Sequence, residues 1–321
     1  MNKAGFFLMA SVSILTAGGK MGGSEIVEYC GYKDCIKLEN KSVKLVLSGA
    51  CGGRVLEYSL NGKNAIYLDR EQDGWTYVPG KDKINPGGGR LDIGPERIVP
   101  KHLDLWIGKW TAEITGQFSA SLTSAQDKET GVQLIRNFNL APDSSILTVT
   151  QTIRNISDKT VSYCHWSRTL APPDGICIVP LTPDSHYPEK YIMYKGNTID
   201  FRPKDENILV KDDSIIIKAC PEYSKLGFDS SSGWLAYMVP NDILFIKKFP
   251  VYPDRVYNEI TGMTVCIYYH KKFCELEPIG PKEIIKPGQS ASFTEIWQLE
   301  NFPFPGNANT IDIVKVKTLL K

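Results

Sequence analysis

Short strand-like segments follow one another along almost the whole chain. Runs rich in Val, Ile, Tyr, Phe and Thr alternate with turn residues, as in antiparallel β-structure. Helical periodicity is nearly absent, and only 311–321 is ambiguous between helix and strand. Many short strands predict a sandwich or a barrel, and we expect an all-β fold, a large antiparallel sandwich. The clearest predicted strands are 43–47, 54–60, 65–68, 145–155, 214–220, 234–239, 243–249 and 264–270.

Two of the predicted turns join neighbouring strands directly. Asn61 and Gly62 lie between 54–60 and 65–68, and Asn-Gly is the strongest short signal for a hairpin. Asn241 and Asp242 lie between 234–239 and 243–249 and predict a second hairpin.

The N-terminal segment has the layout of a secretory signal peptide. Lys3 is followed by an uncharged, mostly apolar run from 4 to 17 and then by small residues. This run is too short to span a membrane comfortably. The alternative to a signal peptide is a buried N-terminal helix. We therefore predict a signal peptide over 1–22 and a secreted or periplasmic protein. No linker divides the remainder, so 23–321 is expected to form a single domain.

Charge and cysteine content limit the partners that this chain is expected to have. The formal net charge is +1, which suggests neither nucleic acid nor, after signal removal, a membrane as a partner. There are eight cysteines, and Cys30 and Cys35 are close enough to close a small disulfide loop if the protein is exported. CxxC pairs are missing and the four histidines are scattered, so we expect no metal and no other cofactor.

Two glutamates near the C-terminus stand out as candidate functional residues. Glu275 and Glu277 lie two apart in a strand-like run, before a turn marked by proline and glycine. Side chains two apart in a strand face the same way. Two carboxylates on one face are not expected in an apolar core, so they should face water or a polar group. Close spacing would also raise the pKa of one of them.

Three segments together resemble the galactose mutarotase-like superfamily, which includes the aldose 1-epimerases. The segment 39–68 resembles its opening hairpins, 145–169 its middle strands, and 273–299 its C-terminal strands. The resemblance extends over about 36–300 and implies a supersandwich of antiparallel sheets with a sugar-binding face. The segments 87–96 and 225–238 are most similar to branches of the superfamily without an assigned function.

The same resemblance implies a pair of residues for proton transfer. In true mutarotases a glutamate is the base on the anomeric hydroxyl and a histidine is the acid on the ring oxygen, on opposite sides of a C–O bond. Glu277 falls at the position of the base, with Glu275 as the alternative, and His165 falls near that of the acid. The histidine motif departs from the family pattern, and the nearest upstream histidine, His102, matches poorly. A surface carboxylate and a core histidine are the competing interpretations.

Candidate substrate-binding residues come from loops and tryptophans. Arg90 follows three glycines, and it is interpreted either as a donor to sugar hydroxyls or as a loop arginine paired with Asp92 or Glu96. Tryptophans stack on sugar rings or simply fill the core. The full set of predicted substrate-binding residues is Arg90, Glu96, Trp106, Trp166, His186 and Lys225.

Two functions follow from these residues. The first is a secreted carbohydrate-binding protein that is also a sugar epimerase or mutarotase, with Glu277 as base and His165 as acid. The second is a non-catalytic carbohydrate-binding module of a polysaccharide-utilisation system. A purely structural sandwich is the third alternative. Catalysis requires that His165 and the glutamates share one cleft.

Overall fold

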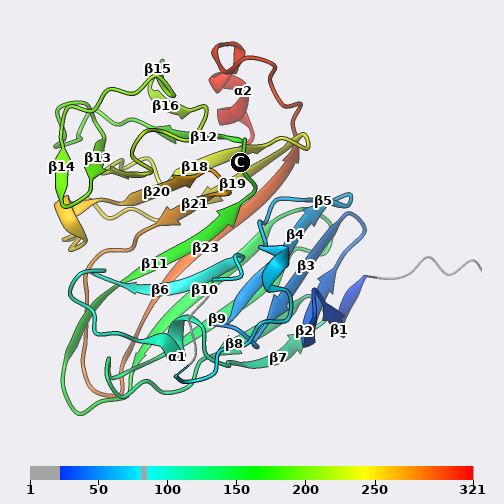
Figure 1. The fold of residues 1–321 in the computed structure, drawn as a ribbon. Coiled ribbons are helices and arrows are strands. Elements are labelled where there is room, and N and C mark those ends of the chain that lie inside the picture. The colour runs from blue at the N-terminus through cyan, green and yellow to red at the C-terminus, as the bar shows by residue number, and fades with distance from the viewer. Residues whose placement is uncertain (1–21, 81–84, 321) are drawn as a thin grey trace, which may run out of the picture.

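The computed structural model describes residues 22–80 and 85–320. Two antiparallel sheets dominate it, and strands account for 48% of the described residues against 6% for helices. The long strands cross the molecule diagonally and are shared by its two halves (Figure 1). The predicted all-β sandwich is therefore confirmed. The predicted signal peptide lies outside the described residues except for Gly22, and a single domain over 23–321 stays a prediction.

The first sheet carries 13 strands of the described chain, in the order β1-β2-β3-β4-β6-β11-β21-β20-β17-β13-β14, with β5 paired to β4 and β22 to β11. Its strands are β1 (Gly23–Tyr29), β2 (Tyr32–Glu39), β3 (Val43–Ser48), β4 (Arg54–Leu60), β5 (Lys63–Asn64), β6 (Gly89–Gly94), β11 (Val161–Ala171), β13 (Ile192–Lys195), β14 (Thr198–Asp200), β17 (Lys225–Phe228), β20 (Val265–His270), β21 (Phe273–Pro278) and β22 (Glu283–Ile285).

The second sheet carries ten strands of the same described ranges, in the order β15-β16-β12-β18-β19-β23-β10-β9-β8-β7. Its strands are β7 (Thr111–Gly116), β8 (Ser119–Thr123), β9 (Val132–Leu140), β10 (Leu147–Asn155), β12 (Ile176–Pro180), β15 (Ile208–Lys211), β16 (Ser214–Ile217), β18 (Trp234–Val239), β19 (Ile243–Lys248) and β23 (Ser290–Asn301).

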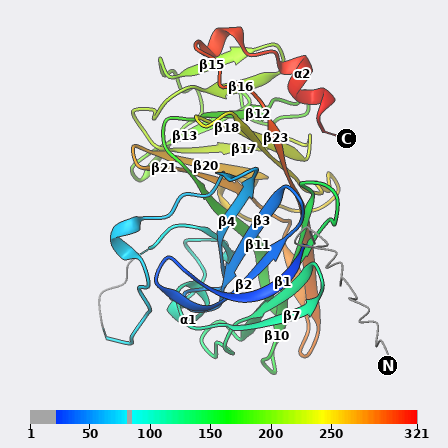
Figure 2. The same cartoon turned by 90° about the vertical axis from the view of Figure 1, so that its right-hand side faces the viewer.

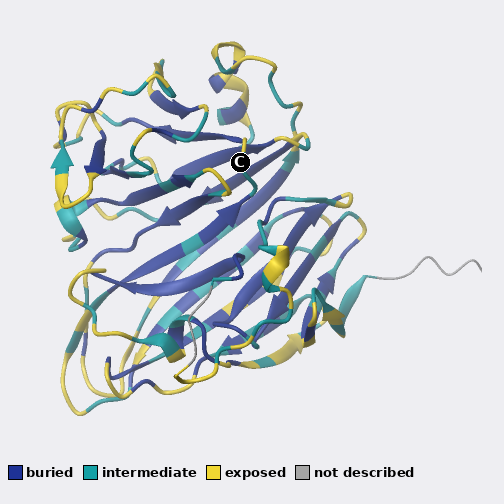
Figure 3. Cartoon of the chain, in the orientation of Figure 1, coloured by how far each residue is buried: buried dark blue, intermediate teal, exposed yellow. Residues whose placement is uncertain are grey.

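The main core lies between the two sheets. In β9 the even-numbered positions Val132, Leu134, Phe138 and Leu140 are buried, which is the alternation of a strand with one face in a core. At the centre, Trp297 packs against Phe245 with ring centroids 5.4 Å apart. Central strands of the first sheet are buried on both faces (Figure 3). The outer face of that sheet is thus covered, and the candidate site lies there.

The C-terminal tail covers a second apolar cluster on the outer face of the second sheet. The ambiguous segment 311–321 forms the helix α2 (Ile313–Thr318), capped by the side chain of Asp312. Its buried residues Ile313 and Val316 pack on β12, β16, β18 and β19, and α2 lies beside that end of the sheet (Figure 2). The other helices are short: η1 (Arg70–Gln72), α1 (Leu103–Trp106), η2 (Ile260–Gly262) and η3 (Ala308–Thr310).

Both predicted hairpin turns are present, and one predicted strand is wrong. Asn61 and Gly62 have φ of 51° and 79° and join β4 to β5. However, β5 ends at Asn64, whose side-chain amide donates to the carbonyl of Ile66, and 65–68 lies outside the ladder apart from a bridge between Leu68 and Gly87. The second hairpin pairs β18 with β19 through Asp242, whose φ is 65°.

The suggested disulfide between Cys30 and Cys35 does not form. Both thiols are free, and Cys30 accepts a hydrogen bond from Arg70 while Cys35 is buried. Cys30 lies in the tight turn between β1 and β2, whereas Cys35 lies within β2, where its partner is Val27. Among the residues that the structure describes, no helix is long and apolar enough to cross a membrane.

Candidate functional site

Strand alternation gathers charged side chains on the outer face of the first sheet. In β6 and β11, Arg90 pairs with Arg168 and Asp92 with Trp166, so these four side chains share one face. Thr169 pairs with Leu276, which places Glu277 beside Arg168 on the neighbouring strand β21. The prediction that Glu275 and Glu277 share one face of a strand is confirmed by this register.

Ion pairs connect these side chains into one network. Arg90 Nη1 lies 2.6 Å from Asp92 Oδ2, and Arg168 Nε lies 3.6 Å from the same oxygen. Arg168 Nη2 also lies 2.9 Å from Glu96 Oε1. Lys225 on β17 reaches the other oxygen of Glu96 at 2.6 Å. Arg90, Glu96 and Lys225, predicted from sequence as ligand-binding residues, are thus brought together.

His102 completes the network from the loop before α1. Its Nε2 lies 2.7 Å from Asp92 Oδ1 and its Nδ1 lies 2.6 Å from the carbonyl oxygen of Pro100. Both partners are acceptors, so each ring nitrogen donates and the ring is a cation. Burial opposes the charge, but the hydrogen bond and charge of Asp92 outweigh it and raise the pKa of His102.

A pocket of about 290 Å³ opens at this network. It is bounded by β6, β11, the loop 96–102 and α1, and it includes the side chains of Arg90, Asp92, Glu96, His102, Trp106 and Arg168. Arg90 stacks over the ring of Trp106, with Cζ 5.0 Å from the ring centroid. Trp106 is half-buried and forms part of the pocket lining.

The two carboxyl groups that line this pocket have lowered pKa values. Burial would raise the pKa of Glu96, but the charges of Arg168 and Lys225 outweigh it and lower the pKa to about 2. Burial likewise opposes ionisation of Asp92, but Arg90 and His102 hold its pKa well below its usual range. Both groups are anions at neutral pH and are fixed acceptors.

Glu277 lies behind Arg168 and is almost completely buried. Its Oε2 accepts the indole hydrogen of Trp166 and lies 4.0 Å from Arg168 Nε. Burial and the neighbouring carboxyl group of Glu275 raise the pKa of Glu277 to about 8, although Arg168 opposes that shift. Glu277 therefore holds a proton at neutral pH, and the polar groups that surround the two glutamates account for their burial.

The structure separates His165 from the glutamates. His165 lies on the opposite face of β11 from Trp166 and Arg168, toward the interior between the sheets. It is fully buried, its Nε2 lies 3.1 Å from the carbonyl oxygen of Ala291, and its ring stacks on Phe293. Burial lowers the pKa of His165 to about 4. The expected pairing of a Glu277 base with a His165 acid does not fit this geometry.

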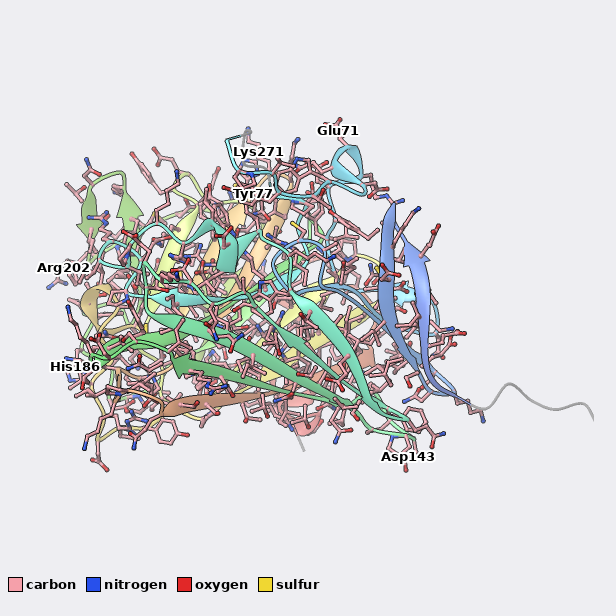
Figure 4. All side chains as sticks on the ribbon, turned by 90° about the horizontal axis from the view of Figure 1, so that it is seen from below. Glu71, Tyr77, Asp143, His186, Arg202 and Lys271 are labelled. Carbon is pink, nitrogen blue, oxygen red and sulfur yellow. The ribbon has the colours of Figure 1, made fainter. Side chains whose placement is uncertain are left out.

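Two other predicted ligand-binding residues also lie away from the pocket surface. Trp166 is 0% exposed, and Arg168 covers its ring with Cζ 4.3 Å from the centroid, so no sugar can stack on it directly. The side chain of His186 is 91% exposed and pairs with Asp229. It lies at an end of the molecule (Figure 4) and is absent from the pocket lining.

The three glycines before Arg90 approach the chain's own backbone. Gly87 and Gly88 have φ of 92° and 83°, and a Cβ on Gly88 would lie 2.7 Å from the carbonyl oxygen of Val55. Arg54 Nη1 donates to the carbonyl of Gly87 at 2.6 Å. The glycine turn therefore sets the direction in which β6 begins. Arg90 is a buried strand residue rather than an exposed loop residue.

A buried ion pair supports the site from beneath. Lys247 on β19 and Glu295 on β23 are fully buried, with Nζ 3.0 Å from Oε2. The same ammonium donates to Ser167 and Thr169 on β11 and to the carbonyl of Leu276 on β21, each at 3.1 Å. These contacts fix the two strands that carry Arg168 and Glu277 from the interior.

The sequence interpretation missed Asp92, His102 and Arg168 as site residues. Asp92 and Arg168 each lie two positions after a named candidate in a strand, so the alternation was the available signal. His102 was noted but matched the family motif poorly. Within 22–80 and 85–320, no group of three or more His, Cys, Asp or Glu side chains converges as metal ligands.

Comparisons with solved structures identify the fold. No protein-family model matches the chain, and no curated protein is significantly similar to it. A galactose mutarotase-like protein of Lactobacillus casei is 11% identical, covers 83% of this chain and 100% of its own, and has a TM-score of 0.58. A galactose mutarotase-related enzyme of Lactobacillus acidophilus is 12% identical, with 84% and 98% coverage and a TM-score of 0.55.

A third structure, a galactose mutarotase-like protein of Clostridium acetobutylicum, is 10% identical, with 88% and 100% coverage and a TM-score of 0.55. These matches extend over most of the chain, and the fold is that of galactose mutarotase-like proteins. The resemblance inferred from the three sequence segments is confirmed at the level of fold. Identities this low do not carry over an activity.

Proposed function

We propose that this protein binds carbohydrate in the pocket between β6, β11 and α1. The observation that carries the proposal is the convergence of fixed charged side chains and a half-exposed tryptophan on one pocket of about 290 Å³. The mutarotase-like fold supports a sugar as the partner in general.

The chemistry of the pocket suits a hydroxyl-rich ligand. A sugar hydroxyl both donates and accepts, and the pocket offers carboxylate acceptors (Asp92, Glu96) beside the cationic donor Arg168. These groups already hold one another in place, so little side-chain entropy is lost on binding. Trp106 adds a half-buried aromatic ring to the pocket lining, with Arg90 over one of its faces.

Binding without catalysis is the activity that the pocket supports best. A general base must be ionised, but Glu277 holds a proton near pH 7 because burial and Glu275 raise its pKa to about 8. Arg168 also lies between Glu277 and the pocket, and the resemblance-implied acid His165 faces the interior. These features favour a non-catalytic carbohydrate-binding protein, such as a component of a polysaccharide-utilisation system.

A sugar epimerase is the second candidate, and the perturbed carboxyl group of Glu277 favours it. Perturbed pKa values gather at catalytic sites. In this alternative Glu277 exchanges a proton with the ligand above pH 8, and the His102 cation is the second proton-transfer group in place of His165.

Calorimetric titration with glucose, galactose and galacturonate tests the first proposal. Saturable binding that is lost in Trp106→Ala and kept in Tyr252→Ala supports the pocket, because Tyr252 is an exposed aromatic residue outside it. The absence of binding to any sugar would contradict the proposal. Nuclear magnetic resonance of anomer exchange in the bound sugar at pH 6 and pH 9 then separates binding from catalysis.

We further propose that residues 1–22 direct export. Cell fractionation of the full chain and of a chain that begins at 23 tests this directly. Export of both chains, or retention of both inside the cell, would contradict the proposal.

A further inference from the structure

Four aromatic rings form a continuous strip at the end of the β20–β21 hairpin. The strip consists of Tyr67, Tyr268, His270 and Phe273. Phe273 is its centre, with ring centroids 5.6 Å from Tyr67, 6.2 Å from Tyr268 and 5.2 Å from His270. Tyr268 and His270 are nearly parallel, with an interplanar angle of 2°. The rings therefore form one contiguous aromatic cluster.

The aromatic strip lies on the same face of the first sheet as the proposed sugar pocket. Tyr268 pairs across the strands with Glu275 and with Lys225, and Phe273 lies two residues before Glu275 in β21. Phe273 lies four positions before Glu277 in β21, which is about 13 Å along a strand. The polar side chains of Glu275 and Lys225 lie next to Tyr268 of the strip, and Lys225 connects this row to the pocket through its ion pair with Glu96.

The aromatic strip is not part of the hydrophobic core. All four rings are only half-buried, and none of them belongs to the buried apolar clusters found among the described residues. Lys271, at the hairpin tip beside the strip, lies far from Arg202 and Asp143 (Figure 4). A half-exposed aromatic cluster outside the core is a candidate surface for a ligand.

We propose that the aromatic strip is a second subsite, on which further sugar units of an oligosaccharide stack while one unit occupies the pocket. This inference rests on the proposed sugar-binding function and deepens it, because it assigns a chain of sugars rather than a single sugar as ligand. Flat, half-exposed rings suit the C–H faces of sugar rings, and the polar row between the two sites suits the hydroxyls of the connecting units. A ligand that reaches from the pocket at Arg168, which lies opposite Glu277, to Phe273 about 13 Å along β21 is longer than one sugar ring.

Affinity for one sugar at two chain lengths tests the inference. The probes are glucose, galactose and galacturonate, each with its linear tetrasaccharide, titrated against the purified protein. We expect a tetrasaccharide to bind about tenfold or more tightly than its monosaccharide. In Tyr268→Ala the tetrasaccharide should lose most of that gain while the monosaccharide affinity stays unchanged.

Two further variants keep the result interpretable. Tyr268→Leu keeps the bulk of the side chain without the aromatic face and should lose the same gain even if Tyr268→Ala folds poorly. Phe201→Ala removes an exposed aromatic residue that contacts Tyr187 instead, and it should change neither affinity.

Three outcomes would overturn the inference. Equal affinity for monosaccharide and tetrasaccharide would overturn it and leave the sugar pocket intact. Equal losses for both probes in Tyr268→Leu would do the same, because the residue would then act on the pocket itself. Failure of every monosaccharide and every tetrasaccharide to bind would overturn this inference together with the proposed function.

Discussion

Arg168 and Glu277 lie side by side on neighbouring strands, with Nε 4.0 Å from Oε2, and the arginine covers the glutamate. The guanidinium also pairs with Glu96 and Asp92, so a single side chain joins the pocket to the buried carboxyl group behind it. A ligand in the pocket meets Arg168 before it meets Glu277. This order is the structural reason for proposing binding rather than catalysis.

Arg168→Met is expected to abolish sugar binding and to destabilise the protein by about 2–4 kcal/mol, because it leaves buried carboxylates without their partner. Calorimetry and urea unfolding measure the two effects. Arg255→Met is the matched control, since Arg255 pairs with Glu283 at a more exposed position and should cost about 1 kcal/mol or less. Normal sugar affinity in Arg168→Met would contradict the assigned site.

Glu277→Gln is expected to change how stability depends on pH. The pKa of Glu277 is raised to about 8 in the folded protein from an ordinary value of 4.5, so the folded state binds the extra proton between these values. The stability that the protonated Glu277 side chain contributes is fully present below about pH 4.5, falls as the pH rises and is lost above about pH 8. The side chain in Glu277→Gln cannot ionise, so this fall in stability with rising pH is absent from the variant.

Urea unfolding of both proteins at pH 5, 6.5 and 8 measures this difference. We expect the variant to gain stability relative to the parent protein as the pH rises across that range. His102 and His165 titrate in both proteins, so their effects cancel in the comparison. A difference in unfolding free energy that does not change with pH would show that the Glu277 pKa is not raised.

His165→Ala is expected to lower stability by about 2–4 kcal/mol, because it opens a cavity against Phe293, and to leave sugar affinity unchanged. His102→Ala should show the opposite pattern, with a loss of sugar affinity and a smaller loss of stability, because its ring lines the pocket. Thermal unfolding and calorimetry on the two variants distinguish the roles. If His165→Ala loses sugar binding and His102→Ala keeps it, the result would instead support the Glu277 base and His165 acid that the resemblance implies.

Lys247→Met is expected to destabilise the protein by about 3–5 kcal/mol, because it leaves the Glu295 carboxylate buried without its counter-charge. Adding Glu295→Gln should recover part of that loss, since the buried negative charge is then removed as well. Urea unfolding of the single and double variants forms the test. Additive losses in the double variant would mean that the two residues do not act as a pair.

Much of the sheet structure could be predicted from the sequence. The strands at 54–60 and 234–239 have the predicted bounds, and those at 43–47, 145–155, 243–249 and 264–270 are shifted by two residues at most. The predicted strand 214–220 ends three residues early, at Ile217, and the run 65–68 lies outside the named strands although Ala65 and Ile66 are buried in the main core. A short apolar run carries no information about which neighbour will bury it.

The candidate site was predicted only in part. Arg90, Glu96, Trp106 and Lys225 meet at the pocket network, but His165, Trp166 and His186 do not line it. His165 and Trp166 differ by one position, and in a strand that difference moves a side chain to the other face. Which of them faces the interior depends on the pairing of β11 with β6 and β21.

By itself, the sequence determined the all-β class, most of the strands and the shared face of Glu275 and Glu277, because these follow from local composition and from the two-residue period of a strand. Only the tertiary structure decided that this face is covered by Arg168, that His102 joins it and that 313–318 becomes a helix. These outcomes depend on contacts between residues far apart in the chain. Register and burial of that kind are set by the whole sandwich, and no single segment contains them.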